Sequence, residues 1–571
     1  MSDKQDNIPV YKLRRMLLLL LFLLAVGLLV WRAVYLQVFN RDFLQSEGDA
    51  RHLRVVSIPA HRGMIMDRNG EPLAISTPVD SIWAVPEELA AQRDALPAVA
   101  RLLHVDLESL QRMLAGRMDR EFVYLRRHVN PDLARKIISL EVPGLFTQRE
   151  YRRYYPASEV TAHVVGFTDI DDQGQEGLEL AYNDWLQGTP GSKRVIKDRL
   201  GRIVEDVESI QPSSPGKDLT LSIDRRIQYL AYRELKAAVQ QHKARSGSAV
   251  LLDVKTGEIL AMVNQPSYNP NNRKHMRSSQ YRNRAITDVF EPGSTIKPFT
   301  IATALESGKY SPTTLIDTTP GYYKIGSYTV HDHINYGVIN VTRVITKSSN
   351  VGASKIALSL DPERIWSMFN RVGFGSVSAS AFPGESAGLM THYSRWHDIE
   401  RATMSFGYGL SVTPLQLAHA YSILAADGIN RPVSLLKQTR PVEGQRVISA
   451  PVTQQVRAMM ETVISKEGTG SRASVQGYRV AGKTGTVHKS AAGGYSVDRY
   501  ISVFAGMAPA SKPRLVLVVM INEPEGEEYY GGQVAAPVFS SMMSGALRLM
   551  NIAPDDAPIL QTGIDKRDAH S

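Results

Sequence analysis

Three Ser-x-x-Lys patterns occur in the chain, and such a pair can supply a nucleophile and its base. They begin at Ser214, Ser294 and Ser434. A serine hydroxyl becomes a strong nucleophile only when a base takes its proton, and a lysine amine is a useful base when burial or positive charge lowers its pKa. The alternative is an ordinary helix start, with the serine as N-cap. The surrounding residues must decide between the two.

Only the copy at Ser294 lies where a helix is predicted to begin. Pro292-Gly293 precedes it, and Pro298, which a helix tolerates only in its first turn, follows it. Positions i and i+3 share a helix face, so we expect the Lys297 amine within hydrogen-bond reach of the Ser294 hydroxyl. The first copy falls in a Pro/Gly-containing linker, and the third in a loop or strand, where positions three apart face opposite sides.

Lys-Thr-Gly occurs twice, at Lys255–Gly257 and at Lys483–Gly485. The first copy separates two apolar runs and predicts a hairpin turn. The second precedes further strand candidates and predicts a strand, in which Thr484 and Thr486 share a face and Gly485 allows a substrate or neighbouring backbone to come close. This surface suits the anionic end of a peptide. The charge of Lys483 would also lower the pKa of Lys297.

A Ser-x-Asn pattern at Ser348 and Asn350 opens another predicted helical run and could relay a proton. Alone, this pattern is more often a helix cap. A second copy, at Ser267 and Asn269, lies in a Pro-rich turn. In the order Ser294-x-x-Lys297, Ser348-x-Asn350, Lys483-Thr484-Gly485, with separations of 54 and 135 residues, the three motifs are far more specific than any one of them.

The chain resembles the class B penicillin-binding proteins, and among them most nearly the division-specific peptidoglycan D,D-transpeptidases. The resemblance covers nearly the whole chain, and beyond the three motifs it includes "RGMIMDRNG", "RRYYP", "GQEGLE", "FGYGLSVTPLQLA" and "YYGGQVAAPVFS". It implies a membrane-anchored enzyme that crosslinks stem peptides through a serine acyl-enzyme during septal wall synthesis. β-Lactams would acylate the same serine.

The resemblance also implies a role for each motif residue. Ser294 would attack the D-Ala-D-Ala stem, Lys297 would be its base, and Ser348 would pass protons between the two lysines and the leaving amine. Asn350 would hold the acyl chain, and Lys483 would take part in the proton relay. Thr484, Gly485 and Thr486 would bind the substrate end. The N–H groups of Ser294 and Thr486 would form the oxyanion hole. Two alternatives stay open: a D,D-carboxypeptidase, or a penicillin-binding sensor or scaffold.

Histidines contribute no predicted catalyst or metal site. His488 stands where relatives often have arginine, before the Gly-rich "SAAGGYS", and is predicted to be a solvated strand residue. His331 and His333 would share a strand face, but two ligands are fewer than zinc usually takes. We expect no metal and no cofactor.

An uncharged apolar stretch near the N-terminus predicts a membrane anchor. The uncharged part is 16–31; carried on through Arg32 to Leu36, the segment would form about 31 Å of helix, enough to cross a bilayer core. Lys4, Lys12, Arg14 and Arg15 precede it, which predicts a cytoplasmic N-terminus and a periplasmic catalytic domain at the bacterial inner membrane. A cleaved signal peptide and a buried core helix are the alternatives.

Composition and linkers complete the expected organisation. The 571 residues carry a net charge of +9 and no cysteine, which excludes disulfides and thiolate chemistry and gives no support for a nucleic-acid partner. We expect an α+β fold, with an antiparallel sheet flanked by helices behind a transmembrane helix and an elongated α+β pedestal. The expected parts are a cytoplasmic segment 1–15, the anchor 16–38, a dimerisation or docking pedestal 39–215, a transpeptidase domain 216–558 and a flexible tail 559–571. The resemblance further implies a glycan polymerase partner of the FtsW kind and other division proteins.

Overall fold

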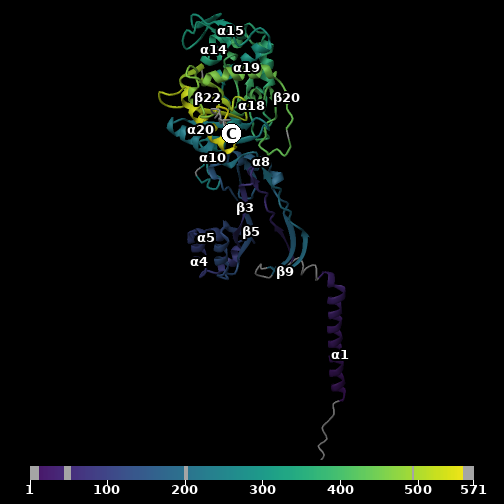
Figure 1. Cartoon of the computed structure of the whole chain (residues 1–571). Coiled ribbons are helices and arrows are strands. Elements are labelled where there is room, and N and C mark those ends of the chain that lie inside the picture. The colour runs from purple at the N-terminus through teal and green to yellow at the C-terminus, as the bar shows by residue number, and fades with distance from the viewer. Residues whose placement is uncertain are drawn as a thin grey trace, which may run out of the picture. The chain divides into compact units, whose positions relative to one another are not determined.

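The computed structural model describes residues 12–43, 53–197, 203–274, 276–440, 442–491 and 494–556 (Figure 1). The expected tail 559–571 lies outside them. The chain folds into two compact units: unit 1 comprises Met1–Ala60, Pro78–Tyr151 and Thr189–Pro215, and unit 2 comprises His61–Thr77, Arg152–Gly188 and Gly216–Ser571.

Unit 1 begins with the predicted anchor helix, drawn in purple in Figure 1. Helix α1 spans Lys12–Val34 and continues as a π-helical turn η1, Tyr35–Phe39. It is the one helix among the described residues that is long and apolar enough to cross a membrane. None of its residues is buried, so the alternative of a buried core helix is wrong.

The rest of unit 1 is a mixed region with its own apolar core. Strands β3 (Pro72–Ala84) and β5 (Leu145–Tyr154) pair with each other. The remaining elements are β1 Leu53–Ile58, α3 Pro86–Ala91, α4 Leu96–Leu103, α5 Leu107–Ala115, β4 Val123–Val129, α6 Pro131–Ile138, β8 Gly191–Lys197 and β9 Ile203–Gln211. β1, β8 and β9 form a three-stranded sheet. The core comes from buried side chains such as Leu89, Leu103 and Leu110.

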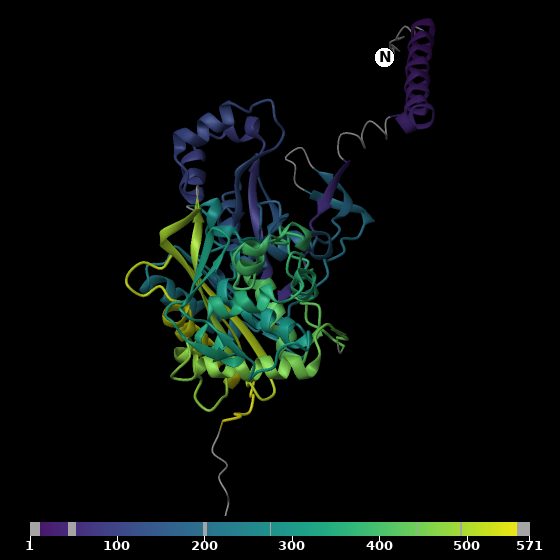
Figure 2. The ribbon, with the colours of Figure 1, turned by 90° about the horizontal axis from the view of Figure 1, so that it is seen from above.

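Unit 2 is built around a five-stranded antiparallel sheet in the order β12-β11-β23-β22-β21. Its strands are β11 Ser246–Asp253, β12 Ile259–Gln265, β21 Ala481–Ala491, β22 Gly494–Ala508 and β23 Leu515–Asn522. Segments far apart in sequence therefore lie side by side, as the teal and yellow-green strands of Figure 2 show. β21 pairs with β22 alone, so it forms an edge of the sheet.

Helices cover both faces of this sheet, as its alternating side chains require. Val250 and Val518 face one apolar cluster, shared with α18 (Pro414–Ala425). Leu251 and Leu517 face the other, shared with α10 (Arg225–Gln241) and α20 (Gly531–Leu549), which contact each other (Figure 1). The predicted α+β fold, an antiparallel sheet flanked by helices, is confirmed.

The other elements of unit 2 are mostly short. The N-terminal ones are β2 Ile65–Met66, η2 Ser158–Val160, α7 Ala162–Val165, β6 Phe167–Thr168, β7 Gly174–Glu176, α8 Gly177–Ala181, α9 Asn183–Leu186 and β10 Leu219–Thr220. The middle ones are α11 Ser278–Tyr281, α12 Arg284–Thr287, η3 Gly293–Ile296, α13 Lys297–Glu306, β13 Leu315–Asp317, β14 Tyr322–Ile325, β15 Tyr328–His331, β16 Val338–Asn340, α14 Val341–Lys347, α15 Asn350–Leu358 and α16 Pro362–Arg371. The last are β17 Leu389–Met390, η4 Tyr393–Arg395, α17 Asp398–Met404, β18 Leu410–Ser411, β19 Ile429–Asn430, β20 Gln445–Arg446, α19 Ala450–Glu461, η5 Thr462–Ile464 and η6 Ser471–Ala473.

Candidate active site

Ser294 and Lys297 lie where a 3₁₀ turn, η3, passes into helix α13. Pro298 is in the first turn of α13, as the sequence predicted. The Lys297 Nζ donates a hydrogen bond to the Ser294 Oγ at 2.9 Å, so the i and i+3 side chains do meet. Lys297 is fully buried, while Ser294 is partly exposed. The hydroxyl is therefore reachable from solvent and the amine is not.

Two contacts, one from the "FGYG" segment and one from α18, hold this turn in place. The Gly293 N–H donates to the Gly407 carbonyl, and a Cβ on Gly407 would lie 2.1 Å from the Gly293 carbonyl oxygen. Only glycine fits there. From α18, the buried Tyr421 hydroxyl donates to the Thr295 carbonyl at 2.8 Å. These two contacts therefore support the turn that carries Ser294.

Ser348 lies between two helices. It follows α14 in a left-handed conformation, φ 61°, and Asn350 begins α15. The N-cap of α15 is Ser349, whose hydroxyl accepts from the Gly352 N–H at 2.8 Å. The capping role that the pattern allowed thus belongs to Ser349, and the Ser348 hydroxyl is left to face the lysines.

Lys483 reaches the same point from edge strand β21. Its Nζ donates to the Ser348 Oγ at 2.9 Å, and the Lys297 Nζ lies 3.2 Å from that oxygen. Lys297 also donates to the Ser348 carbonyl at 2.6 Å and to the Asn350 Oδ1 at 2.7 Å. The three motifs converge on one hydrogen-bonded cluster, although 54 and 135 residues separate them.

Burial sets the protonation of both amines. It lowers the pKa of Lys297 to about 7, against the opposing attraction of the Asp332 carboxylate. It also lowers the pKa of Lys483 well below its usual value, with the positive charge of Lys297 as a second cause. Of the two causes that the sequence allowed, burial and a nearby positive charge, burial of the Lys297 amine is the main one. A neutral lysine is available near neutral pH.

The Lys-Thr-Gly-Thr strand packs against both the turn that carries Ser294 and α20. A Cβ on Gly485 would lie 3.0 Å from the Pro292 carbonyl oxygen, so the close neighbour that Gly485 admits is the backbone of that turn. The Thr486 Oγ1 accepts from the Gly531 N–H at 2.9 Å, which leaves the threonine proton free to be donated. The Thr484 hydroxyl is 2.7 Å from that of Thr469.

Asp332 is the member of this cluster that the sequence did not reveal. Its carboxylate accepts from the Ser349 hydroxyl at 2.5 Å and from two N–H groups at the start of α15. It lies 17 residues before Ser349, just after β15, and belongs to no motif. A lone aspartate in a polar loop carries no local signal of such a contact.

The histidine predictions were partly wrong. His488 is in strand β21, but it is half-buried and lies 2.9 Å from the Ser496 carbonyl through Nδ1, with its ring 4.7 Å from that of Tyr500. Strand β15 ends at His331, so His333 lies beyond it and the two do not share a strand face. The His333 ring instead lies 6.0 Å from the ring of Tyr530.

The other motif copies lie in structural positions. Lys255–Gly257 forms the turn between β11 and β12, as predicted. The Ser434 hydroxyl donates to the Leu436 carbonyl and accepts from its N–H. Ser214 pairs with Thr189 through two backbone hydrogen bonds.

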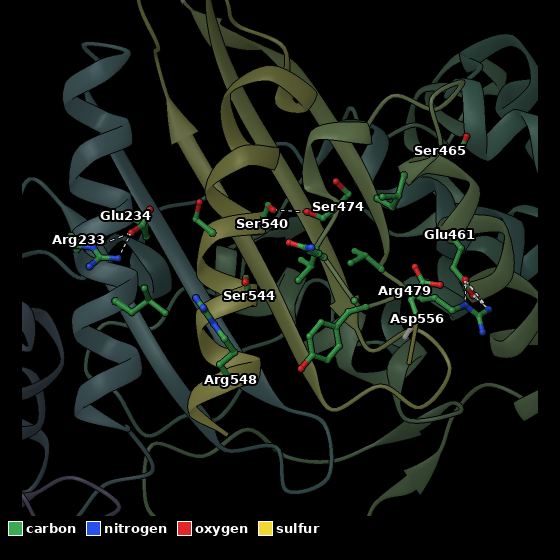
Figure 3. Close-up of a pocket in the computed structure, with 18 residues that line it drawn as sticks. Arg233, Glu234, Glu461, Ser465, Ser474, Arg479, Ser540, Ser544, Arg548 and Asp556 are labelled. Carbon is green, nitrogen blue, oxygen red and sulfur yellow. Dashed lines mark hydrogen bonds and ion pairs between the residues drawn. The ribbon is translucent and has the colours of Figure 1, made fainter. Parts of the chain in front are cut away.

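A groove of about 990 Å³ on unit 2 contains none of the predicted residues. Figure 3 shows side chains from α10, α20 and residues 474–480 around it, among them Ser540, Ser544 and Arg548. Arg479 pairs there with Glu461 at 2.8 Å. The reactive cluster therefore lies outside this groove.

Known proteins match both parts of the chain. Residues 247–544 match the penicillin binding protein transpeptidase domain, and residues 57–221 match the penicillin-binding protein dimerisation domain. The chain is 48% identical to the peptidoglycan D,D-transpeptidase FtsI of Escherichia coli K12, over 93% of this chain and 91% of that protein. It is 44% identical to the "probable peptidoglycan D,D-transpeptidase PbpC" of Pseudomonas aeruginosa, over 95% and 96%.

Solved structures share the fold. The TP domain of penicillin-binding protein 3 from Burkholderia pseudomallei matches with a TM-score of 0.55 and 43% identity, covering 59% of this chain and 98% of that one. A peptidoglycan synthetase from Bifidobacterium adolescentis matches in fold with a TM-score of 0.70, covering 89% of this chain and 98% of that one. With the two domain matches and the near full-length relatives, the chain belongs to the class B penicillin-binding proteins.

Proposed function

We propose that this protein is a membrane-anchored D,D-transpeptidase that crosslinks peptidoglycan stem peptides during septal wall synthesis, with Ser294 as its nucleophile. Relatives over nearly the full length carry the D,D-transpeptidase name. One observation supports the choice of residue above all: the Lys297 amine, buried and with a pKa of about 7, lies 2.9 Å from the Ser294 hydroxyl.

The first half-reaction forms an acyl-enzyme. Neutral Lys297 takes the Ser294 proton as Oγ attacks the carbonyl carbon of the penultimate D-Ala. N–H groups of Ser294 and Thr486 stabilise the oxyanion. The peptide C–N bond then breaks, and the proton passes from Lys297 through the Ser348 hydroxyl to the departing D-Ala amine. The short Lys297–Ser348–Lys483 contacts support this relay.

The second half-reaction makes the crosslink. An amine of a neighbouring stem attacks the ester carbon, gives up its proton through the same relay, and the ester C–O bond breaks to restore the Ser294 hydroxyl. Asn350 holds the acyl chain, and Thr484 and Thr486 bind the substrate carboxylate beside Gly485. Because the free proton of Thr486 can be donated, an anionic peptide end suits this strand.

The anchor and domains follow the same proposal. Exposed helix α1 fits a transmembrane anchor. Basic residues before its apolar stretch favour a single pass of the bacterial inner membrane with the catalytic domain in the periplasm. Segment 1–15 would be cytoplasmic and 16–38 the anchor, with 39–215 the docking pedestal, 216–558 the transpeptidase domain and 559–571 a tail. The partners would include an FtsW-type glycan polymerase and other division proteins.

A labelled penicillin tests the nucleophile. We expect the full-length protein to be labelled at Ser294 and S294A to lose the label. The matched control is S434A, which alters a Ser-x-x-Lys serine that bonds Leu436 instead of a lysine amine. S434A should be labelled like the wild type. Persistent labelling of folded S294A at another residue would refute the assignment.

Product analysis tests the reaction. Glycan strands with uncrosslinked stems, made with a partner polymerase where needed, are incubated with the protein and digested for mass spectrometry. Dimeric stem peptides, lost in S294A, are expected. A product that contains trimmed monomers and no dimers would favour the carboxypeptidase. Labelling by penicillin without any peptide product would favour a sensor or scaffold.

A further inference from the structure

We propose that Asp332 is a positioning residue of this active site, which fixes the turn from Ser348 to Asn350 and aims the Asn350 amide at Lys297. The inference rests on the proposed function, because it assumes that Lys297 is the base. Asp332 itself does not contact the reacting atoms in this account. It acts through α15 and through the charge that it presents to the lysine.

The Asp332 carboxylate ties down the start of α15. One oxygen accepts from the Asn350 N–H at 2.5 Å and the Val351 N–H at 2.9 Å, and the other accepts from the Ser349 hydroxyl at 2.5 Å. These N–H groups have no partner within the helix, and the anion also lies at the positive end of its dipole. Ser349 caps Gly352, so the two residues share the first turn.

The residue before Asp332 fixes the Asn350 side chain. The His331 carbonyl accepts from the Asn350 Nδ2 at 3.1 Å, and the Asn350 Oδ1 accepts from the Lys297 Nζ at 2.7 Å. A carbonyl can only accept, so the NH₂ end of the amide must face His331. The oxygen must then face the lysine. The chain from His331 to Asp332 therefore holds both the backbone and the amide of Asn350.

The Asp332 backbone is held in turn. Its N–H donates to the Gly321 carbonyl at 2.9 Å, at the base of the β14–β15 hairpin. The Gly321 carbonyl, Asp332 and the Asn350 N–H are thus joined by hydrogen bonds. A shift of the carboxylate would move Ser349 and, with it, the adjacent Ser348. The Ser348 hydroxyl, which lies between the two lysines, would then be displaced.

The carboxylate also acts on Lys297 electrostatically. The charged groups that face the Lys297 amine are Lys483 from β21 and Asp332, and Asp332 raises the pKa that burial lowers. Tyr336 faces Asp332, and its own pKa is raised by burial and then by that carboxylate. His331 and His333 flank Asp332 in sequence. Removal of the Asp332 charge should therefore lower the pKa of Lys297 further.

Three variants of the full-length protein separate position from charge. D332N keeps the shape and removes the charge, D332E keeps the charge and displaces it by one methylene, and D317N removes an exposed carboxylate from strand β13 as the matched control. The measurement is the second-order rate of acylation by a fluorescent penicillin between about pH 5 and 9. Melting curves establish which variants are folded.

For D332N we expect the high-pH plateau to fall at least about tenfold and the midpoint to move to lower pH by about one unit. D332E should lose plateau rate with the midpoint near that of the wild type, and D317N should match the wild type in both. A folded D332N with a wild-type plateau would overturn the inference. A lowered plateau with a midpoint that does not fall would overturn its electrostatic part.

If D332N does not fold, D332E tests the role of Asp332. A lowered high-pH plateau of the D332E acylation rate supports the inference, and a wild-type plateau overturns it. Failure of the proposed function looks different. In that case S294A would still be labelled, whatever Asp332 does. Labelling that depends on Ser294 while D332N and D332E behave as wild type would refute only the role of Asp332.

Discussion

Replacing Gly531 by alanine should displace the strand that carries Thr486. Gly531 opens α20, and its N–H donates to the Thr486 hydroxyl at 2.9 Å. An added Cβ would lie 2.3 Å from the Gly485 carbonyl oxygen and 2.5 Å from that of Val503. Both atoms belong to backbone in the central sheet, so neither can swing away as a flexible side chain would.

The size of the effect follows from that overlap. Ordinary contact begins at 3.4 Å, so α20 and β21 must separate by about 1 Å. A displacement of this size at a reacting centre can cost about 100-fold in rate. The hydrogen bond that aims the Thr486 hydroxyl would also be lost, at about 1 kcal/mol. We therefore expect G531A to be acylated about 10- to 100-fold more slowly.

The assay is the second-order acylation rate with a fluorescent penicillin, measured on folded protein. G116A is the control, because the nearest atom to its new Cβ, the Arg112 carbonyl oxygen, is at 3.4 Å and nothing must move. G116A should react like the wild type. A folded G531A that is acylated at the wild-type rate would show that the position of β21 does not depend on this contact.

Two further outcomes are expected. The wild-type acylation rate should fall about tenfold per pH unit below pH 7, because burial lowers the pKa of Lys297 to about 7 and only its neutral form accepts a proton; a rate that stays flat down to pH 5 would exclude Lys297 as the base. E179Q should destabilise unit 2 by about 3–5 kcal/mol, because the fully buried Glu179 accepts from Arg62 at 2.8 Å and from Arg153 at 2.6 Å, and both cations would stay buried without it. Thermal unfolding measures this loss of stability. E208Q, in the exposed Arg194–Glu208 pair, is the control and should melt like the wild type. A melting temperature of E179Q equal to that of the wild type would contradict the reasoning.

Local rules predicted the parts of the site that depend on element phase. Helical spacing with an early proline brought Ser294 and Lys297 together, and strand alternation placed Thr484 and Thr486 on one face. Each of these geometries is complete within a few residues. The order of the three motifs along the chain supported the family resemblance, and that resemblance predicted that the motifs form one site.

Contacts made only by the tertiary fold could not be predicted. Asp332 meets α15 because a hairpin returns there, and Gly531 meets Thr486 because α20 begins against the sheet. The lowered pKa of Lys297 depends on how completely the amine is desolvated, which no spacing gives. The left-handed turn at Ser348 was missed because glycine, asparagine and aspartate are the residues that usually signal such a conformation, and serine is not.

That turn sets folding stability against activity at one position. A residue with a side chain costs roughly 1–2 kcal/mol in the left-handed region, and glycine would avoid that strain. Glycine would also remove the hydroxyl between Lys297 and Lys483. Selection for thermal stability alone would therefore favour glycine at position 348, which lacks the hydroxyl that the proposed proton relay uses.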